Sequence, residues 1–180
     1  GIVGLFLFSE QTLTIAADGP VAAPSTSSIE QALTQVTSED ESVREAAIRV
    51  LIEQGDVSLV PRLEEIRANA DRSIRQPIKQ LIDLFKNRAK LTSPNSDVRR
   101  SAATDLGTSG KPSAVPWLDA AAANEPNKWV RYTMEESAAL LKLASDDPSI
   151  KAVAAEKLGE LGSEIGEPTL KQLVAAGDGA

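Results

Sequence analysis

The feature that most constrains the fold of this chain is an internal repeat. Three segments align without gaps when Val43, Val98 and Ile150 are placed at position zero. Six positions are then identical in all three copies: serine at −5, alanine at +4, leucine at +8, glycine at +12, proline at +18 and leucine at +20. Repeats of this kind bury their apolar faces by stacking on their neighbours. We therefore expect a repeat architecture.

The repeated residues specify a helix, a turn and a second helix. Asp40, Asn95 and Asp147, at position −3, can accept hydrogen bonds from the free N–H groups at a helix start. Positions zero, +4 and +8 share one face of that helix, so we expect all three to be buried. The glycine at +12 can end the helix in the left-handed conformation. The proline at +18 suits the first turn of the second helix, and the leucine at +20 turns that helix onto the first.

The interval between copies leaves room for a third helix. Val43 and Val98 are 55 residues apart, and Ile150 follows after another 52. Ile74-Arg75 and Val130-Arg131 repeat the apolar-basic start and predict a helix in each interval. The predicted helices cover 29–36, 41–54, 57–69, 72–90, 96–108, 112–123, 127–143, 147–160 and 165–176. No segment alternates apolar and polar residues as a strand would. The expected fold is all-α, an α-solenoid of helical repeats.

Composition excludes several kinds of site. The chain contains no Cys and no His, which excludes Cys nucleophiles, His general bases and nearly every zinc, copper or haem site. Its net charge of −7 argues against nucleic acid as a partner. No nucleophile elbow, phosphate-binding loop or metal motif is present. We expect a non-catalytic protein without a cofactor or a metal site.

The start of the chain lies outside the repeat pattern. Gly1–Phe8 is the most hydrophobic stretch, but it is shorter than the roughly 20 residues that cross a bilayer. With Ile15-Ala16-Ala17-Asp18 it resembles the end of a secretory signal peptide cleaved after Ala17. A membrane anchor, or a core or disordered arm, is the alternative. The expected organisation is a signal-peptide remnant (1–17), a flexible linker (18–28), the repeat domain (29–176) and a tail (177–180).

The repeat pattern resembles a known family of helical repeats. The pattern is Asp/Asn-x-x-Val-Arg-x-x-Ala-x-x-x-Leu-x-x-x-Gly, followed by x-Val-Pro-x-Leu. It is similar to the HEAT-like repeats grouped with the phycobilisome lyases, over roughly residues 38–176. Such repeats support many unrelated activities, so this resemblance implies a fold and not a reaction.

A narrower resemblance concerns the order of several segments. The chain is similar to the extracytoplasmic N-terminal region of the urea ABC transporter permease subunit, of the branched-chain amino-acid permease family. The segments that carry the likeness are Leu84-Phe85-Lys86, Leu91-Thr92-Ser93-Pro94, Asp97-Val98-Arg99, Val130-Arg131, Glu135-Glu136-Ser137-Ala138-Ala139, Leu143–Pro148 and Leu158–Ser163. The resemblance implies a periplasmic location and membrane-spanning segments outside this chain. Its pore motifs do not occur here, so no transport residue can be assigned.

Basic and aromatic side chains are the candidates for a partner-binding surface. Equivalent helix starts carry Arg44, Arg75, Arg99, Arg131 and Lys151. These side chains could line one face and bind an acidic partner. The alternative, which we favour, is that they pair with helix-cap carboxylates such as Asp40, Asp97 and Asp147 of adjacent repeats.

The aromatic and acidic residues allow similar alternatives. Trp129 and Tyr132 could form a binding hot spot together with Trp117, or the aromatic side chains could pack between repeats, as we favour for Trp117. Glu39-Asp40-Glu41 could hold a cation, but its carboxylates also suit the positive end of the next helix, and Asp146-Asp147 is interpreted in the same way.

The function that this sequence predicts is an interaction domain. The first hypothesis is a non-catalytic, extracytoplasmic domain of a urea-type ABC permease, binding a protein partner such as a transporter subunit or a substrate-binding protein. The second is a free-standing secreted or periplasmic adaptor, and the third is a lyase-type repeat protein that acts on a chromophore-bearing partner.

Overall fold

The computed structural model describes residues 26–175, and these residues form helices joined by short turns, with no strand among them. The interpretations of 1–17, 177–180 and most of 18–28 lie outside the described residues. The helices are α1 (Thr26–Gln35), α2 (Glu41–Gln54), α3 (Val60–Asn69), α4 (Arg72–Lys90), α5 (Ser96–Gly107), α6 (Val115–Asn124), α7 (Lys128–Lys142), α8 (Pro148–Leu161) and α9 (Glu167–Ala175).

Every predicted helix is present, and most bounds agree within a few residues. Short 3₁₀ turns at Val57–Leu59 and Pro112–Ala114 precede α3 and α6, where the sequence predicted continuous helix. The predicted linker extends too far, because α1 already begins at Thr26.

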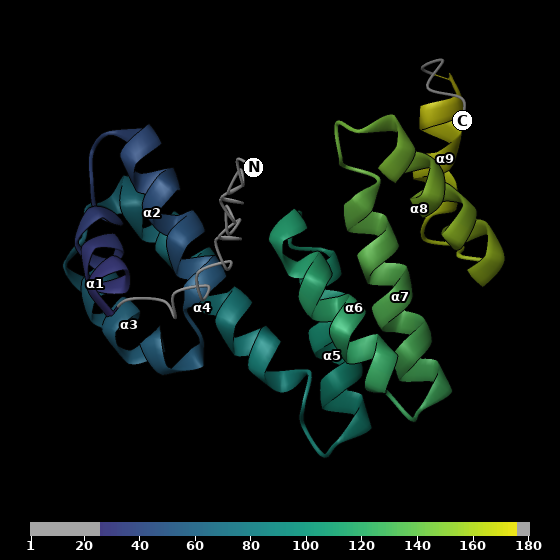
Figure 1. Ribbon diagram of the computed structural model, residues 1–180, viewed down its shortest axis with the longest axis horizontal. Helices are drawn as coiled ribbons and strands as arrows, with labels where there is room; N and C mark the ends of the chain where they lie inside the picture. Colours follow the sequence, from purple (N-terminus) through teal and green to yellow (C-terminus); the bar gives the residue numbers. More distant parts are fainter. Residues whose placement is uncertain (1–25, 176–180) are drawn as a thin grey trace, which may run out of the picture.

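The helices form three consecutive units along the long axis of the molecule (Figure 1): α1–α4, α5–α7, and α8 with α9. Each unit has its own apolar core. The long helices α4 and α7 join the units, because each contributes to two cores. Leu81 of α4 lies in the first core and Leu84 in the second, while Met134 of α7 lies in the second and Ala139 in the third. The described residues form an α-solenoid of helical repeats, as the sequence predicts.

The helix starts confirm the predicted caps. The side chains of Asp40 and Asn95 each accept hydrogen bonds from two backbone N–H groups in the first turns of α2 and α5, and Asp147 accepts one at the start of α8. Pro148 is the first residue of α8, where the missing N–H of proline costs least. The serine at −5 accepts a hydrogen bond from the N–H of the cap residue in all three copies, at 3.1–3.2 Å. Serine is therefore retained at −5 because it fixes the loop that enters the helix.

The predicted buried face is correct at two of its three positions. The alanine at +4 and the leucine at +8 are at most 2% exposed in every copy. Position zero is not buried: Val43 is half-buried, Val98 is 36% exposed and Ile150 is 43% exposed. Positions +4 and +8 are rotated by about 40° and 80° from position zero, so the buried arc is centred away from it. Burial at the corresponding residues of α4 and α7, Ile74 and Val130, arises because these helices pack on two sides.

The glycine at +12 serves two different purposes. Gly110 and Gly162 adopt the expected left-handed conformation, with φ of 64° and 62°. Gly55 does not, since its φ of −91° and ψ of 173° are extended. A Cβ at Gly55 would lie 2.5 Å from the carbonyl oxygen of Leu51 and 2.6 Å from Cδ1 of Leu59. In the first copy, glycine is therefore required because there is no room for a side chain.

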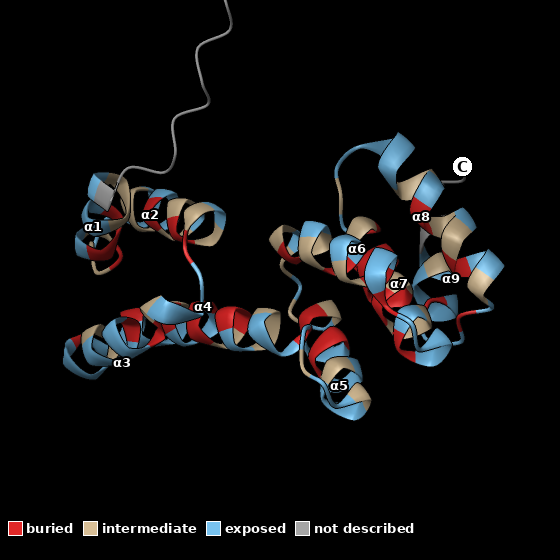
Figure 2. Ribbon diagram, turned by 60° about the horizontal axis from the view of Figure 1, so that its bottom comes forward, coloured by how far each residue is buried: buried red, intermediate tan, exposed pale blue. Residues whose placement is uncertain are grey.

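The second helix of each copy follows the prediction closely. The proline at +18 falls in the first turn of α3, α6 and α9. The leucine at +20 is fully buried in α3 and α6, as Leu63 and Leu118, and half-buried in α9, as Leu170. Figure 2 shows buried and exposed residues alternating along most helices, as expected where one face of a helix packs on its neighbours.

Candidate interaction surface

The arginines at position +1 hold the loops in front of their own helices. Nη1 of Arg44 donates a hydrogen bond of 2.8 Å to the carbonyl oxygen of Ser38, and Nη1 of Arg99 donates one of 2.7 Å to that of Ser93. Because a guanidinium offers five donors in a fixed fork, one side chain can satisfy several loop carbonyls. Both arginines do so, and each reaches a second carbonyl at the next residue, at 3.4 and 3.2 Å.

The same arrangement recurs at the starts of α4 and α7. Nε of Arg75 donates to the carbonyl oxygen of Ala70 at 2.8 Å, and Nη1 of Arg131 donates to that of Glu125 at 3.2 Å. Lys151, in the third copy, is half-buried and is also engaged. The basic series is thus used within the fold, which agrees with the favoured interpretation.

The partners of these cations differ from the prediction. Asp40 and Asp147 accept from the N–H groups of their own helices, and Asp97 pairs with Arg100 at 3.2 Å. The hydrogen-bonded N–H and hydroxyl groups of the following serines lower the pKa of Asp40 and of Asp147. Cap carboxylates are already committed to their helices, so the arginines bind loop carbonyls instead. The acidic run around Asp40 therefore serves as a helix cap.

One arginine of the series also reaches a carboxylate. Nε and Nη2 of Arg99 donate to the two carboxylate oxygens of Glu125, at 2.6 and 2.7 Å. The Glu125 side chain is 3% exposed, and it also accepts from the backbone N–H of Asn127 at 2.9 Å. The hydrogen-bonded guanidinium holds the pKa of Glu125 below its usual value, against the effect of burial. This pair ties the first turn of α5 to the α6–α7 loop.

The predicted aromatic candidates lie in three different environments. Trp129 is 64% exposed, and the ammonium of Lys128 lies 5.0 Å from its ring. Tyr132 is half-buried and donates a hydrogen bond to Glu136 at 3.2 Å, and burial beside that carboxylate raises its pKa. Trp117 is half-buried against the second core, as favoured from the sequence. They do not form a single aromatic cluster, although Trp129 is available to a partner.

Trp117 also takes part in a contact between units. The guanidinium carbon of Arg88, near the end of α4, lies 4.7 Å from the centroid of the Trp117 ring. Nη1 of Arg88 donates to the carbonyl oxygen of Gly55, in the turn after α2, at 3.1 Å. Arg88 therefore connects a turn of the first unit to α6 of the second.

An apolar surface hollow lies between α6, α7 and α8, and the sequence interpretation did not identify it. This α6–α8 groove has a volume of about 740 Å³. Its apolar lining comprises Pro112, Val115, Pro116, Leu141, Ala144, Ile150 and Val153. Ile150 is 43% and Val153 is 63% exposed. Two exposed apolar residues three apart in the first two turns of α8 were the available signal, but assigning position zero to the core concealed it.

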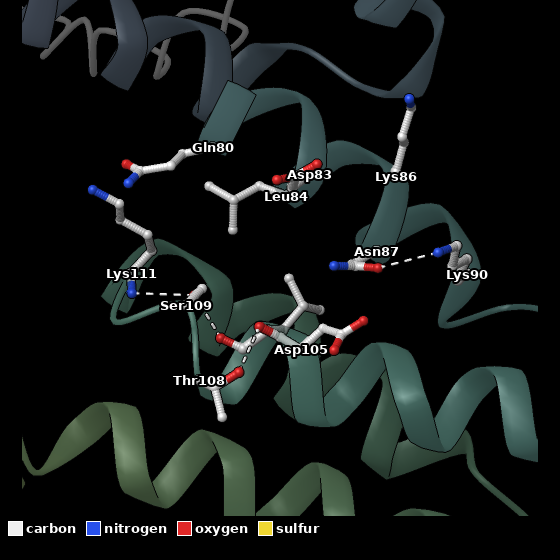
Figure 3. Close-up of a pocket in the computed structure, with 11 residues that line it drawn as sticks. Gln80, Asp83, Leu84, Lys86, Asn87, Lys90, Asp105, Thr108, Ser109 and Lys111 are labelled. Atoms are coloured by element: carbon white, nitrogen blue, oxygen red, sulfur yellow. Dashed lines mark hydrogen bonds between the residues drawn. The ribbon is translucent and has the colours of Figure 1, made fainter. Parts of the chain in front are cut away.

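A second hollow, between α4 and the end of α5, is polar (Figure 3). Its charged lining has both signs, and several of its members already have partners. Lys86 pairs with Glu64 at 2.6 Å, and Asp83 pairs with Lys79 at 2.6 Å. The hydrogen bonds drawn in the figure are local to each helix or turn. We therefore place no ligand in this hollow.

Within 26–175, no three or more carboxylates are grouped so that they could hold a metal ion. No helix in that range is long and apolar enough to cross a membrane.

The geometry defines a class of protein: a helical-repeat solenoid whose surface carries an apolar groove and an exposed tryptophan, Trp129. Comparison with known families gives a match at the centre of the molecule. Residues 98–124, which include most of α5 and all of α6, match the family model of the PBS lyase HEAT-like repeat. No curated protein and no solved structure gives a significant match to the chain.

Proposed function

We propose that this chain is a protein-interaction module that binds an apolar segment of a partner protein in the α6–α8 groove. The observation that carries the proposal is the exposure of Ile150 and Val153 beside Val115 and Leu141. Contiguous exposed apolar surface on a folded protein is typical of interaction sites. HEAT-like repeats are commonly protein-binding scaffolds, which agrees with this function.

The groove also has polar groups that could orient a bound segment. Lys142 and Asp146 both line it; Lys142 pairs with Asp119 at 2.9 Å, and Asp146 belongs to the α7–α8 loop. An apolar floor with a few charged groups at the rim is the usual composition of a protein-binding surface. The partner that fits is a helix or an extended segment with two or more apolar side chains.

A matched pair of variants tests this site. Val153→Glu places a charge in the groove, while Val57→Glu places the same charge at another exposed valine, which is 46% exposed and lies in the 3₁₀ turn before α3. With a substrate-binding protein of the urea-uptake type as the probe, Val153→Glu should weaken binding at least about tenfold and Val57→Glu should not. Equal effects of the two variants, or no binding by the unmodified chain, would contradict the proposed site.

The finer proposal concerns the protein that carries this module. The order of segments that resembles the urea permease subunit, and the signal-like start, support an extracytoplasmic domain of a urea-type ABC transporter. Such a domain would dock a transporter subunit or the substrate-binding protein on the periplasmic side. The test is the full-length gene: it should continue beyond Ala180 into several apolar segments of about 20 residues. Deleting the repeats should then reduce urea uptake through loss of docking.

The second candidate is a free-standing adaptor in the same compartment. This adaptor would use the same groove. The exposed Trp129 is as compatible with an adaptor as with a transporter domain. A stop codon shortly after Ala180 would select the adaptor and exclude the transporter domain.

A further inference from the structure

Arg88 and Arg99 use their guanidinium groups in similar ways, but only one of them binds a carboxylate. Nη1 of Arg88 donates to the carbonyl oxygen of Gly55 at 3.1 Å. Nη1 of Arg99 likewise donates to the carbonyl oxygen of Ser93, while its Nε and Nη2 bind the two oxygens of the Glu125 carboxylate. Nε and Nη2 of Arg88 have no hydrogen-bond partner in the part of the chain that the structure describes. Arg88 therefore offers the same donor edge that binds a carboxylate at Arg99.

The charge of Arg88 is held in place without an ion pair to any described residue. Asp56 lies near it, and the hydrogen bonds of Ser58 together with the charge of Arg88 lower the pKa of Asp56. The Asp56 carboxylate accepts from the N–H of Ser58 at 2.8 Å, and it does not reach Arg88. The Trp117 ring, 4.7 Å from the guanidinium carbon, instead fixes the plane of the group. A guanidinium that is already fixed loses little freedom when it binds a ligand.

Arg88 lines a hollow between the end of α4, α6 and the loops that precede α5 and α7. This α4–α6 hollow has a volume of about 540 Å³, a size typical of ligand pockets. Its apolar lining comprises Leu91, Pro116, Trp117, Ala120, Ala121 and Pro126. Its charged lining comprises Arg88, Arg99 and Glu125, and the last two neutralise each other. The hollow therefore combines apolar walls with the positive charge of Arg88.

We propose that the α4–α6 hollow binds an acidic residue of a partner peptide, with its carboxylate on Nε and Nη2 of Arg88. Charge complementarity supports this occupant, and a carboxylate matches that edge with two parallel hydrogen bonds. An apolar side chain next to the acidic residue contacts the ring of Trp117. Pro116 lines both this hollow and the α6–α8 groove, so one extended segment can enter both. The choice of a peptide thus rests on the proposed function, whereas the carboxylate site at Arg88 does not.

The two tryptophans of the chain provide a readout with its own control. Trp117 lines the hollow, whereas Trp129 is exposed outside it. In proton–nitrogen NMR spectra, the peptide acetyl-Glu-Leu-amide should shift the indole signal of Trp117 and the Nε signal of Arg88, and leave Trp129 unchanged. The peptide acetyl-Gln-Leu-amide should bind at least about tenfold more weakly, because it lacks the charge. Equal binding of the two peptides, or no shift of Trp117 up to about 10 mM peptide, would overturn the proposal.

A matched pair of variants on α6 locates the site. Ala120→Glu places a carboxylate in the hollow, while Ala123→Glu places the same charge at an exposed alanine outside it. The shift of Trp117 by the glutamate peptide should be lost in Ala120→Glu and retained in Ala123→Glu. The same response in both variants would contradict the site. Inorganic phosphate that shifts Trp117 at a lower concentration than the glutamate peptide would also contradict it, and would indicate a phosphate site.

The variant Val153→Glu separates this inference from the proposed function. Val153 lines the α6–α8 groove and not the α4–α6 hollow, so Val153→Glu should keep the Trp117 shift with the glutamate peptide. If Val153→Glu weakens partner binding but the unmodified chain does not respond to the peptide, the groove stands and the carboxylate site is wrong. If the peptide shifts Trp117 but Val153→Glu and Val57→Glu affect partner binding equally, the carboxylate site stands and the groove is wrong.

Discussion

The first and middle units share their repeat positions but differ in how closely their helices pack. In the middle unit α5 packs directly along α7, where Gly107 meets Ser137. In the first unit the corresponding residues of α2 and α4 are Ile52 and Leu81. Two branched side chains replace a glycine and a serine, and α2 packs mainly along α1 instead of α4. Residues outside the repeated set therefore decide the distance between helices.

The greater separation leaves a groove in the first unit. It has a volume of about 470 Å³ between α2 and α4, and Ile48, Ile52, Leu81 and Leu84 contribute its apolar lining. The two units also differ in an ion pair that stabilises only the middle unit. Arg99 has Glu125 as a carboxylate partner, whereas the corresponding pair in the first unit is Arg44 and Ala70. The middle unit is thus closed by close packing and an ion pair that the first unit lacks.

The largest expected effects come from the leucine at +8, which both units share. Leu51 and Leu106 are fully buried, so replacing either by alanine should cost about 2–5 kcal/mol of unfolding free energy. We expect the larger cost for Leu106→Ala, because the closely packed middle unit can relax less around a cavity. Denaturant unfolding measures both values. A cost below about 0.5 kcal/mol at Leu106 would mean that the repeat register is wrong.

Removing the carboxylate of the Arg99–Glu125 pair should affect the middle unit alone. Glu125→Gln leaves a guanidinium without its buried partner, and it should lower the Tm on the order of 5 °C. The sign of the pH effect follows from the lowered pKa of Glu125. Its stabilisation is complete above the ordinary carboxyl pKa and is lost as pH falls through the folded-state pKa.

Thermal melts between pH 6 and 3 measure this effect as the difference in Tm between the unmodified protein and Glu125→Gln. The unmodified protein should lose more Tm on acidification than Glu125→Gln does, so the two curves should converge at low pH. Curves that remain parallel would show that Glu125 contributes no pH-dependent stability.

Adding a methyl group should distinguish close packing in the middle unit from loose packing in the first. Gly107→Ala should cost about 1–3 kcal/mol, even though alanine is the better helix former, because α5 and α7 must separate. Ile52→Ala, at the corresponding position, removes a half-buried side chain beside a groove and should cost about 1 kcal/mol. A neutral or stabilising Gly107→Ala would show that α5 and α7 have room to spare.

Local sequence signals predicted the helices and part of the candidate surface. Asp40, Asn95 and Asp147 predicted helix starts because capping depends on neighbours in the chain. Burial of Val98 could not be judged in this way, since it depends on which helix packs beside α5. The reason for glycine at position 55 could not be predicted either, because it depends on packing: Leu59 fills the space that a Cβ would need.

The candidate surface was predictable to a smaller extent. The internal use of Arg44 was expected, but not its hydrogen bonds to loop carbonyls, because carbonyl positions depend on loop conformation. The α6–α8 groove joins residues of three helices, such as Val115 and Val153, whose proximity no local pattern encodes. Its identification required the structure.

The smallest predicted effect concerns the connection between the two units that differ. Arg88 donates to the carbonyl of Gly55 in the first unit and stacks on Trp117 in the second. One net hydrogen bond and one partly exposed cation–π contact together contribute about 1–2 kcal/mol, so Arg88→Ala should lower the unfolding free energy by about that amount.

The informative readout is cooperativity. If Arg88 couples the open first unit to the closed middle unit, its loss should raise hydrogen exchange in α2 and α3 while α5 and α7 keep their protection. Lys79→Ala is a suitable control, because its ion pair with Asp83 is exposed and lies within α4. A uniform loss of protection across both units in Arg88→Ala would mean that Arg88 adds stability without connecting them.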